Sequence, residues 1–279
     1  MSGPVSAAGP IVGVDLGGTK ALFLCGDDEE RSETGRGFSP VVFEQRLRDF
    51  IARRGIRPAG IGVAVPGLVD LQGRVSACDV LPEFAGWDAR QAFADLGCKV
   101  AVANDVKAAL AEEMHDAAPG TTAGVVMAGT AIGAAFITEG RPLLGACGFA
   151  GELGHMPVLV NGEVRHLDEL AGGSFIASGL GVSSADLARL AHSGDARALE
   201  AIRQGGQALG IGLAAVINLL NPSRLAVGGG ALSLPGYWDA ACTATERHAI
   251  PEMFRACSLS KVRSGARVAA LGAIRIASS

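Results

Sequence analysis

The dipeptide Asn104–Asp105 has the residue types and the position that proton transfer requires. It follows an alternating run, residues 98–103, that predicts a strand, and a helical pattern begins directly after it. In α/β folds the edge where strands end and helices begin opens into a crevice that holds reactive groups. A carboxylate there can accept a proton from a hydroxyl group, so Asp105 is a candidate catalytic base. The alternative is that both residues only cap the helix.

A glycine-rich turn near the start of the chain could bind phosphate groups. Its two adjacent glycines leave backbone N–H groups open to a ligand, and a hydroxyl and an ammonium group follow them. A carboxylate before the glycines could hold a magnesium-bound water or a phosphate-bridging cation. The turn joins two apolar runs that predict a β-hairpin, so a tight hairpin without a ligand is the alternative. The candidate residues are Asp15, Gly17, Gly18, Thr19 and Lys20.

The second half of the chain repeats this pattern. The run Gly129–Thr130–Ala131–Ile132–Gly133 again separates two strand-like segments, and Gly129 and Thr130 are its candidate phosphate-binding residues. A third run, residues 228–230, follows a strand pattern, and Gly229 and Gly230 would let an adenine ring lie against the backbone. A simple strand-to-helix turn is the alternative there. The repeat of strand, turn and strand suggests two related domains.

Apolar periodicity predicts the elements that position these residues. An α/β fold is indicated, with a smaller domain at residues 1–107 plus 265–279 and a larger one at 108–264. A final apolar helix, residues 266–276, is expected to fold back on the first domain, and residues 26–39 are expected to form a loop. The other strands are predicted at 60–65, 73–80, 123–127, 134–138 and 224–227, and helices at 42–53, 88–96, 106–113 and over most of the chain after 167.

Composition excludes several classes of protein. The net charge of −4, spread along the chain, argues against a nucleic-acid-binding protein. Six scattered cysteines indicate a reducing compartment rather than a disulfide framework. Residues 1–10 lack the pattern of a signal peptide, and the uncharged segment 204–223 has too short an apolar part to span a membrane, so it predicts a buried helix. We therefore expect a cytoplasmic protein without membrane association.

Taken in order, the motifs resemble the ROK family of bacterial sugar kinases and repressors, within the hexokinase–actin superfamily. No single motif is specific, but the ordered set covers nearly the whole chain. The matching segments are residues 14–20, 65–70, 104–105, 129–133, 148–156 and 217–222, the last leading into 228–230.

This resemblance implies two ribonuclease-H-like domains of the actin and hexokinase type around a central cleft that binds ATP, Mg²⁺ and a sugar. It implies that Asp105 is the general base, that Asn104, Glu152 and His155 hold the sugar, and that the chain forms a homodimer. The chemistry agrees, because a sugar hydroxyl needs a carboxylate to accept its proton during phosphoryl transfer. Carboxylate and imidazole groups three residues apart can bind neighbouring hydroxyls. A partly buried histidine with one hydrogen bond is the alternative for His155.

The sequence departs from the family pattern in two places. The usual cysteine cluster after the histidine is missing, so we expect no structural zinc. Asp168 takes the position of the family's next sugar-binding glutamate, with Glu169 as a neighbouring candidate. Asp79 stands where many members have asparagine, and its carboxylate could favour an amino sugar by pairing with the ammonium group. A surface aspartate in a loop is the alternative for Asp79.

The predicted function is ATP-dependent phosphorylation of a hexose or amino-hexose, at the 6-hydroxyl. One alternative is a sugar-sensing repressor of the same family, which would need a DNA-binding domain before the first glycine turn. Only fourteen residues precede Asp15, so we expect no such domain. The other alternative is a non-catalytic sugar-binding relative.

Overall fold

The computed structural model describes residues 9–279, and the expectation about a signal peptide in residues 1–10 falls almost entirely outside them. Contacts among the described residues divide the chain into two units. The first contains the residues up to His115, Leu144–Phe149 and Ala266–Ser279, and the second contains Asp116–Leu143 and Ala150–Gly265. The domain limits predicted from the sequence, at residues 107 and 108, stay a prediction.

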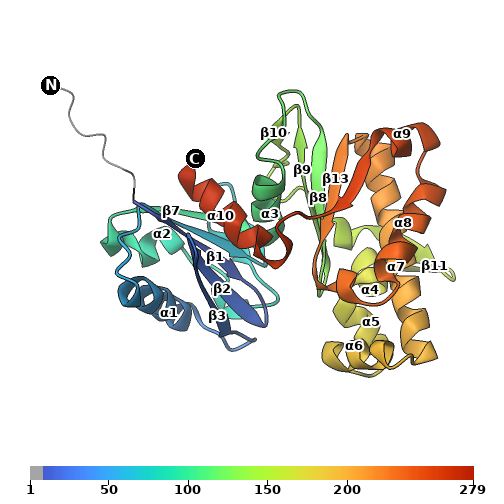
Figure 1. Ribbon diagram of the computed structural model, residues 1–279, viewed down its shortest axis with the longest axis horizontal. Helices are drawn as coiled ribbons and strands as arrows, with labels where there is room; N and C mark the ends of the chain where they lie inside the picture. The colour runs from blue at the N-terminus through green and yellow to red at the C-terminus, as the bar shows by residue number, and fades with distance from the viewer. Residues whose placement is uncertain (1–8) are drawn as a thin grey trace. The chain divides into compact units, whose positions relative to one another are not determined.

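The first unit is built on a five-stranded mixed sheet in the order β3-β2-β1-β4-β7 (Figure 1). β1 runs antiparallel to β2 and parallel to β4, which is parallel to β7. Its strands are β1 (Ile11–Leu16), β2 (Lys20–Cys25), β3 (Asp28–Glu33), β4 (Gly60–Val65) and β7 (Lys99–Asn104), with a separate pair, β5 (Leu68–Val69) and β6 (Val75–Ala77). Its helices are α1 (Pro40–Arg53), α2 (Ala89–Ala92), α3 (Asp105–Glu113) and α10 (Val268–Ser278), with short 3₁₀ turns at Pro82–Phe84, Ala94–Leu96 and Gly265–Arg267.

Helices cover both faces of this sheet. Alternate residues of β1, among them Val12 and Val14, pack with Phe43 and Phe50 of α1 in one buried cluster. On the other face α10 lies so close that a Cβ atom at Gly62 would collide with the Ala273 backbone. The predicted return of the last helix to the first part of the chain is therefore confirmed.

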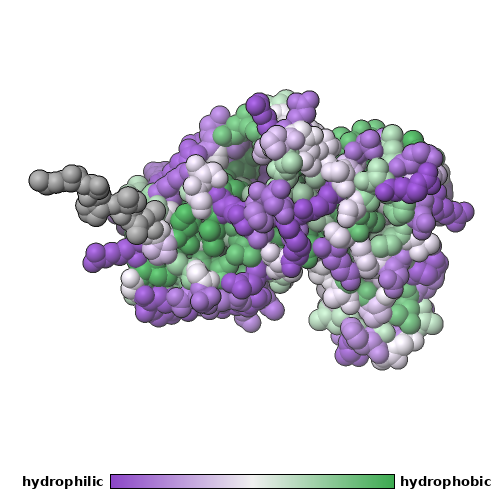
Figure 2. Space-filling view, turned by 45° about the horizontal axis from the view of Figure 1, so that its top comes forward, coloured by the Kyte–Doolittle hydropathy of each residue, from purple (hydrophilic) through white to green (hydrophobic). Residues whose placement is uncertain are grey.

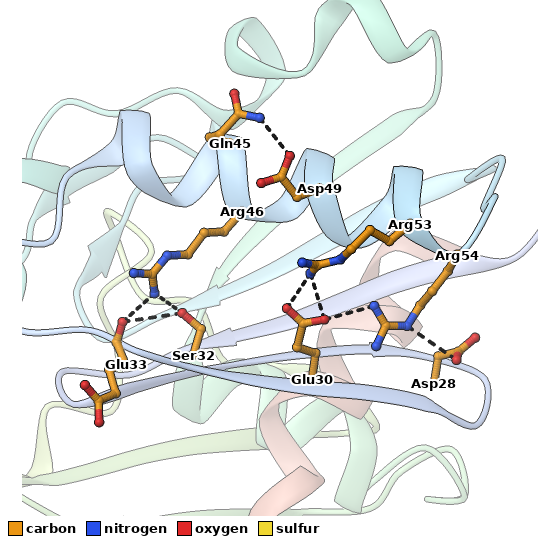
Figure 3. Close-up of polar contacts among 9 residues, drawn as sticks. All are labelled: Asp28, Glu30, Ser32, Glu33, Gln45, Arg46, Asp49, Arg53 and Arg54. Carbon is orange, nitrogen blue, oxygen red and sulfur yellow. Dashed lines mark hydrogen bonds and ion pairs between the residues drawn. The ribbon is translucent and has the colours of Figure 1, made fainter.

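Strand β3 corrects the prediction of a loop over residues 26–39. All six of its residues are polar, so the sequence carries no apolar alternation, yet the strand pairs along its full length with β2. Its polar side chains are held by arginines of α1 and of its C-cap, as Figure 3 shows. Glu30 accepts from Arg53 at 2.7 Å and from Arg54 at 2.9 Å, and Arg46 donates to Ser32. Ion pairs and the backbone ladder form this edge strand where apolar burial does not.

The second unit repeats the same sheet, in the order β10-β9-β8-β13-β14, with β9 antiparallel and β13 parallel to β8. The predicted internal repeat is thus confirmed by the topology. The strands of this sheet are β8 (Ala123–Ala128), β9 (Ile132–Thr138), β10 (Arg141–Pro142), β13 (Arg224–Gly228) and β14 (Ser258–Lys261).

Helices pack against the second sheet around one large buried cluster. The longest, α7 (Ala196–Leu220), contains most of the uncharged segment 204–223 that the sequence predicts as a buried helix, and its apolar face lies in this cluster. The remaining helices are α4 (Leu167–Ala171), α5 (Gly173–Gly179), α6 (Ser184–His192), α8 (Tyr237–His248) and α9 (Pro251–Ala256), with 3₁₀ turns at Leu153–His155 and Gly230–Ser233.

Two features of the second unit were missed from the sequence. β11 (Pro157–Val160) and β12 (Glu163–His166) form a hairpin where only a shortened loop was expected, and β14 is a polar edge strand in a region expected to be helical. β12 and β14 are mostly polar and exposed, so they carry no apolar run by which a strand is identified, and the apolar run of β11 is only four residues long.

Within residues 9–279 every helix is too short or too polar to cross a lipid bilayer. Figure 2 shows hydrophobic residues reaching the surface between hydrophilic ones on the face drawn, which is ordinary for folded proteins.

Candidate functional site

The Asn104–Asp105 pair lies where β7 ends and α3 begins. Asn104 is the N-cap, and its Oδ1 accepts from the backbone N–H groups of Val106 at 3.0 Å and Lys107 at 3.3 Å. Its Nδ2 donates to the Gly67 carbonyl at 3.0 Å, which ties the helix start to the turn after β4. Asp105 is the first helical residue, is half-buried, and accepts from the Val106 N–H at 2.9 Å. Asn104 therefore does cap the helix, and that cap fixes the backbone that carries the Asp105 carboxylate.

The first glycine turn presents free backbone donors. Gly17 N–H bonds to the Lys20 carbonyl at 2.9 Å and closes the turn, while no acceptor among the described residues pairs with the N–H groups of Gly18 and Thr19. Thr34 holds the turn from β3's end, because its Oγ1 donates to the Gly17 carbonyl at 2.7 Å. Two adjacent free N–H groups are a suitable cradle for an anion.

Asp15 lies beneath this turn, on the face of the sheet that α10 covers, between Leu22 and Ala64 of the neighbouring strands. Burial raises the pKa of Asp15 to about 6, and the Arg31 guanidinium acts in the opposite direction. Among the described residues its carboxylate accepts no hydrogen bond. A carboxylate without a hydrogen bond from these residues, beside free N–H groups that could hold an anion, has the hard oxygen donors that Mg²⁺ or its bound waters prefer.

The loop that carries Asp79 contacts both the turn after β4 and the first glycine turn. Cys78 Sγ donates to the Pro66 carbonyl at 3.2 Å, and the Val80 side chain fills the space beside Gly18, where a Cβ atom would collide with it. Burial raises the pKa of Cys78, and the carboxylates of Asp105 and Asp79 raise it further. Asp79 itself is exposed. Both carboxylates are therefore within electrostatic range of the Cys78 thiol.

The second glycine turn, like the first, is closed by one backbone hydrogen bond and leaves two N–H groups free among the described residues. Gly129 N–H bonds to the Ala131 carbonyl at 3.0 Å, and the N–H groups of Thr130 and Ala131 have no acceptor among residues 9–279. The start of α5 holds this turn from outside, because Gly173 N–H donates to the Gly129 carbonyl at 2.8 Å and Ser174 Oγ to the Thr130 carbonyl at 2.8 Å.

Asp168 and Glu169, the two candidate sugar-binding carboxylates, are distinguished by the contacts that they make. Asp168 Oδ1 accepts from the Ile132 N–H at the end of the second turn and lies where a Cβ atom at Gly154 would be. Glu169 instead pairs with Arg165 at 2.9 Å on the surface. Asp168 is therefore the carboxylate that lies beside the second turn and the segment of Glu152 and His155.

Glu152 is the N-cap of the 3₁₀ turn Leu153–His155 and His155 is its last residue, and both side chains are exposed. The His155 ring lies 5.3 Å from that of His166, centroid to centroid. The Glu152 carboxylate has no hydrogen-bond partner among the described residues. Both groups are accessible to a polar ligand.

Gly229 and Gly230 form the turn between β13 and the 3₁₀ turn Gly230–Ser233. Gly229 has φ +100°, and a Cβ atom there would collide with the Ala128 backbone at the end of β8. At Gly230 the space is open within 4 Å. Strand packing therefore requires the first glycine, while the second leaves room for a ligand.

A sequence model of the ROK family matches residues 11–279. The chain belongs to the ROK family. Kanosamine kinase of Amycolatopsis mediterranei is 29% identical over 246 residues, which cover 78% of this chain and 80% of that protein. The xylose repressor of Bacillus spizizenii is 29% identical over 212 residues, which cover 67% of this chain and 54% of the repressor. The structure of the ROK hexokinase from Thermus thermophilus is 27% identical, with a TM-score of 0.78 and coverage of 96% of this chain and 98% of that one.

The candidate residues of this ROK protein thus form two groups. In the first unit, contacts link the first glycine turn to the Asp79 loop, and that loop to the turn that Asn104 holds. In the second, Asp168 links the second glycine turn to the 3₁₀ turn of His155. Within residues 9–279 no cluster of three or more histidine, cysteine or acidic side chains is arranged to hold a metal ion.

Sequence reasoning missed three residues whose hydrogen bonds stabilise the loops around the candidate residues. Thr34 supports the first turn, Cys78 holds the Pro66 carbonyl, and Lys107 donates from its ammonium to the Gly148 carbonyl of this ROK protein. Thr34 and Cys78 have no local signal, since their partners lie far away along the chain. Lys107 does have one, because a cation in the first turn of a helix opposes the helix dipole.

Proposed function

We propose that this ROK protein is an ATP-dependent sugar kinase that phosphorylates a hexose or an amino-hexose at its 6-hydroxyl. The observation that carries the proposal is the Asp105 carboxylate at the end of β7, on a backbone fixed by the Asn104 cap. The similarity to a kanosamine kinase and to a ROK hexokinase supports the same reaction class.

Each group has a role in this reaction. Asp105 accepts the proton of the sugar hydroxyl as the phosphorus–oxygen bond forms. The free N–H groups of the two glycine turns bind the phosphates of ATP, assisted by Thr19, Lys20 and Thr130. Asn104, Glu152, His155 and Asp168 orient the sugar, and Gly229 and Gly230 lie near the nucleoside. Closure around the substrates would exclude water and limit ATP hydrolysis.

Asp15 is the residue that fits magnesium. Its carboxylate is half-buried, accepts no hydrogen bond from the described residues and lies beside the first phosphate cradle. Bound Mg²⁺ would neutralise phosphate charge during the transfer. A cation at this position would also offset the cost of ionising a buried carboxylate.

The variant Asp105→Asn tests the proposal. It keeps the size of the side chain and removes the base, so kcat should fall by roughly 10²–10⁴. Sugar affinity, measured by calorimetry, should change little. Turnover is measured by coupled ADP release with glucose, mannose, their N-acetyl derivatives and free amino sugars. Near-normal turnover in the variant would refute the role of Asp105, and no sugar-dependent ADP release from the unchanged protein would refute the kinase.

Asp79 is proposed to favour cationic amino sugars. It is exposed, it acts electrostatically on the same Cys78 thiol as Asp105 does, and a carboxylate pairs well with an ammonium group. Asp79→Asn should therefore lower the ratio of kcat/KM for glucosamine to that for glucose. An unchanged ratio would contradict this role.

A sugar-sensing or sugar-binding regulator is the second candidate, and the similarity to a xylose repressor favours it. The two functions are separated by the same assay, since a regulator binds sugar without releasing ADP. The homodimer, the cytoplasmic location and the absence of zinc stay predictions; sedimentation measures the first, and metal analysis of the purified protein measures the last.

A further inference from the structure

Lys107 occupies a position that local helix chemistry does not favour. It is the third residue of α3, in the turn whose N–H groups give the helix its positive end. An acidic residue is the usual choice at this position. Its negative charge interacts favourably with the positive end of the helix dipole, and its carboxylate can accept a hydrogen bond from the backbone N–H of the N-cap residue. A lysine that breaks this local rule is expected to serve a contact elsewhere in the fold.

That contact is with residues Leu144–Phe149, which we call the strap. The strap lies in sequence between two parts of the second unit, but its contacts assign it to the first. The Lys107 ammonium donates to the carbonyl of Gly148 in the strap. Gly148 has φ +88°, and a Cβ atom there would lie 3.3 Å from Leu71 and 3.4 Å from the Val69 carbonyl, so the strap packs close to the end of β5.

Lys107 closes a ring of contacts that includes the N-cap of the helix of Asp105. Its backbone N–H donates to Asn104 Oδ1 at 3.3 Å, and Asn104 Nδ2 donates to the Gly67 carbonyl at 3.0 Å. Gly67 leads directly into β5, the strap packs on the end of β5, and the Gly148 carbonyl returns to the Lys107 ammonium. Removal of the ammonium breaks the link to Gly148, whereas the Asn104 cap is made by backbone N–H groups and does not depend on it.

The strap continues into the segment of Glu152 and His155. Gly151 follows Gly148 by three residues and is itself fixed, because its carbonyl accepts from the Ala134 N–H at 2.8 Å and a Cβ atom there would collide with Ala134. The chain before Glu152 is therefore held at two points, and Lys107 supplies the first.

We propose that Lys107 is a positioning residue that fastens the strap to the helix of Asp105 and so keeps ordered the chain that leads into the sugar-binding segment. The inference rests on the proposed sugar-kinase function. Lys107 does not itself contact the reacting atoms in this role; it acts through Gly148 and the residues that lead to Glu152.

The test compares Lys107→Met with Lys107→Arg and with Lys99→Met. Met keeps the aliphatic stem without the donor, Arg keeps a cationic donor, and Lys99 is an exposed lysine of β7 that serves as the matched control. A nitroxide on Cys147, the exposed cysteine within the strap, reports strap mobility directly. Cys98 and Cys242 are changed to serine in every protein so that labelling is specific.

Lys107→Met should increase the mobility of the Cys147 nitroxide and weaken the binding of glucose and glucosamine by about fivefold or more, measured by calorimetry. KM for ATP should stay within about twofold of the parent value. Lys107→Arg should restore much of both effects, and Lys99→Met should change neither.

Equal nitroxide mobility in Lys107→Met and Lys99→Met would overturn the fastening role. Increased mobility with unchanged sugar affinity would overturn the link to the sugar-binding segment. Failure of the kinase proposal has a different signature, namely no sugar-dependent ADP release from the unchanged protein, and the mobility comparison decides the role of Lys107 in the strap in that case as well.

Discussion

The carboxylate of Asp15 should destabilise this protein at neutral pH, and its removal should be stabilising. Asp15 is half-buried in β1 between Leu22 and Ala64, and it accepts no hydrogen bond from the described residues. Its ionised form is therefore held in an apolar setting without a hydrogen bond from these residues, and the Arg31 guanidinium offsets only part of the cost of burial. Asp15→Asn replaces it with a neutral group of the same shape.

The size of the expected change in the free energy of unfolding follows from the pKa of Asp15. Burial raises the pKa of Asp15 from 3.8 to about 6, so the folded state holds this proton more tightly than the unfolded chain does. The stability that depends on the neutral carboxyl is fully present below pH 3.8 and is lost as the pH rises through about 6. At 1.36 kcal/mol per pH unit the full difference is about 3 kcal/mol, and partial solvent exposure reduces the expected gain of the variant to about 1–3 kcal/mol.

Differential scanning calorimetry from pH 4 to pH 8, without nucleotide or magnesium, measures this effect. The melting temperature of Asp15→Asn should match that of the parent near pH 4 and exceed it by roughly 2–10 °C at pH 7.5. Asp27→Asn, an equal charge change at an exposed position in the same unit, is the control and should show no such rise. A gain that does not depend on pH, or a loss of stability at pH 7.5, would refute the reasoning. Kinase activity of Asp15→Asn should fall despite the gain in stability.

Three further changes test the packing of the candidate site. Asp168→Ala leaves the Ile132 N–H without its acceptor and should lower the free energy of unfolding by about 1–3 kcal/mol in urea, whereas Asp168→Asn keeps an acceptor and should lose less. Gly18→Ala forces the Val80 side chain away from the first turn and should raise KM for ATP; adding Val80→Ala should restore it, and a failure of this rescue would count against the steric explanation. Gly272→Ala places a Cβ atom against the backbone of α3 and should lower the melting temperature, with a cost of about 1–3 kcal/mol or more; an unchanged melting temperature would contradict this packing.

Much of the architecture could be predicted because it is encoded locally. Buried strands such as β4 consist of apolar and small residues, and the two glycine turns recur between strands at corresponding places in each half. The start of the helix after Asn104 can be predicted because asparagine is a favoured N-cap residue. The edge strands β3 and β14 could not be found in this way, because distant ion pairs and backbone pairing, rather than apolar burial, keep them in the sheet.

The candidate residues themselves were also identified from the sequence, since their chemistry depends on residue type and on the order of the motifs. The sequence by itself determined the family, the α/β class and the position of Asp105 at a strand end. The tertiary structure separated Asp168 from Glu169, because only three-dimensional packing brings Asp168 to Ile132 while Arg165 engages its neighbour. It also revealed the contact of Lys107 with a strap about forty residues away, a partner that no local pattern specifies because folding alone brings the two segments together.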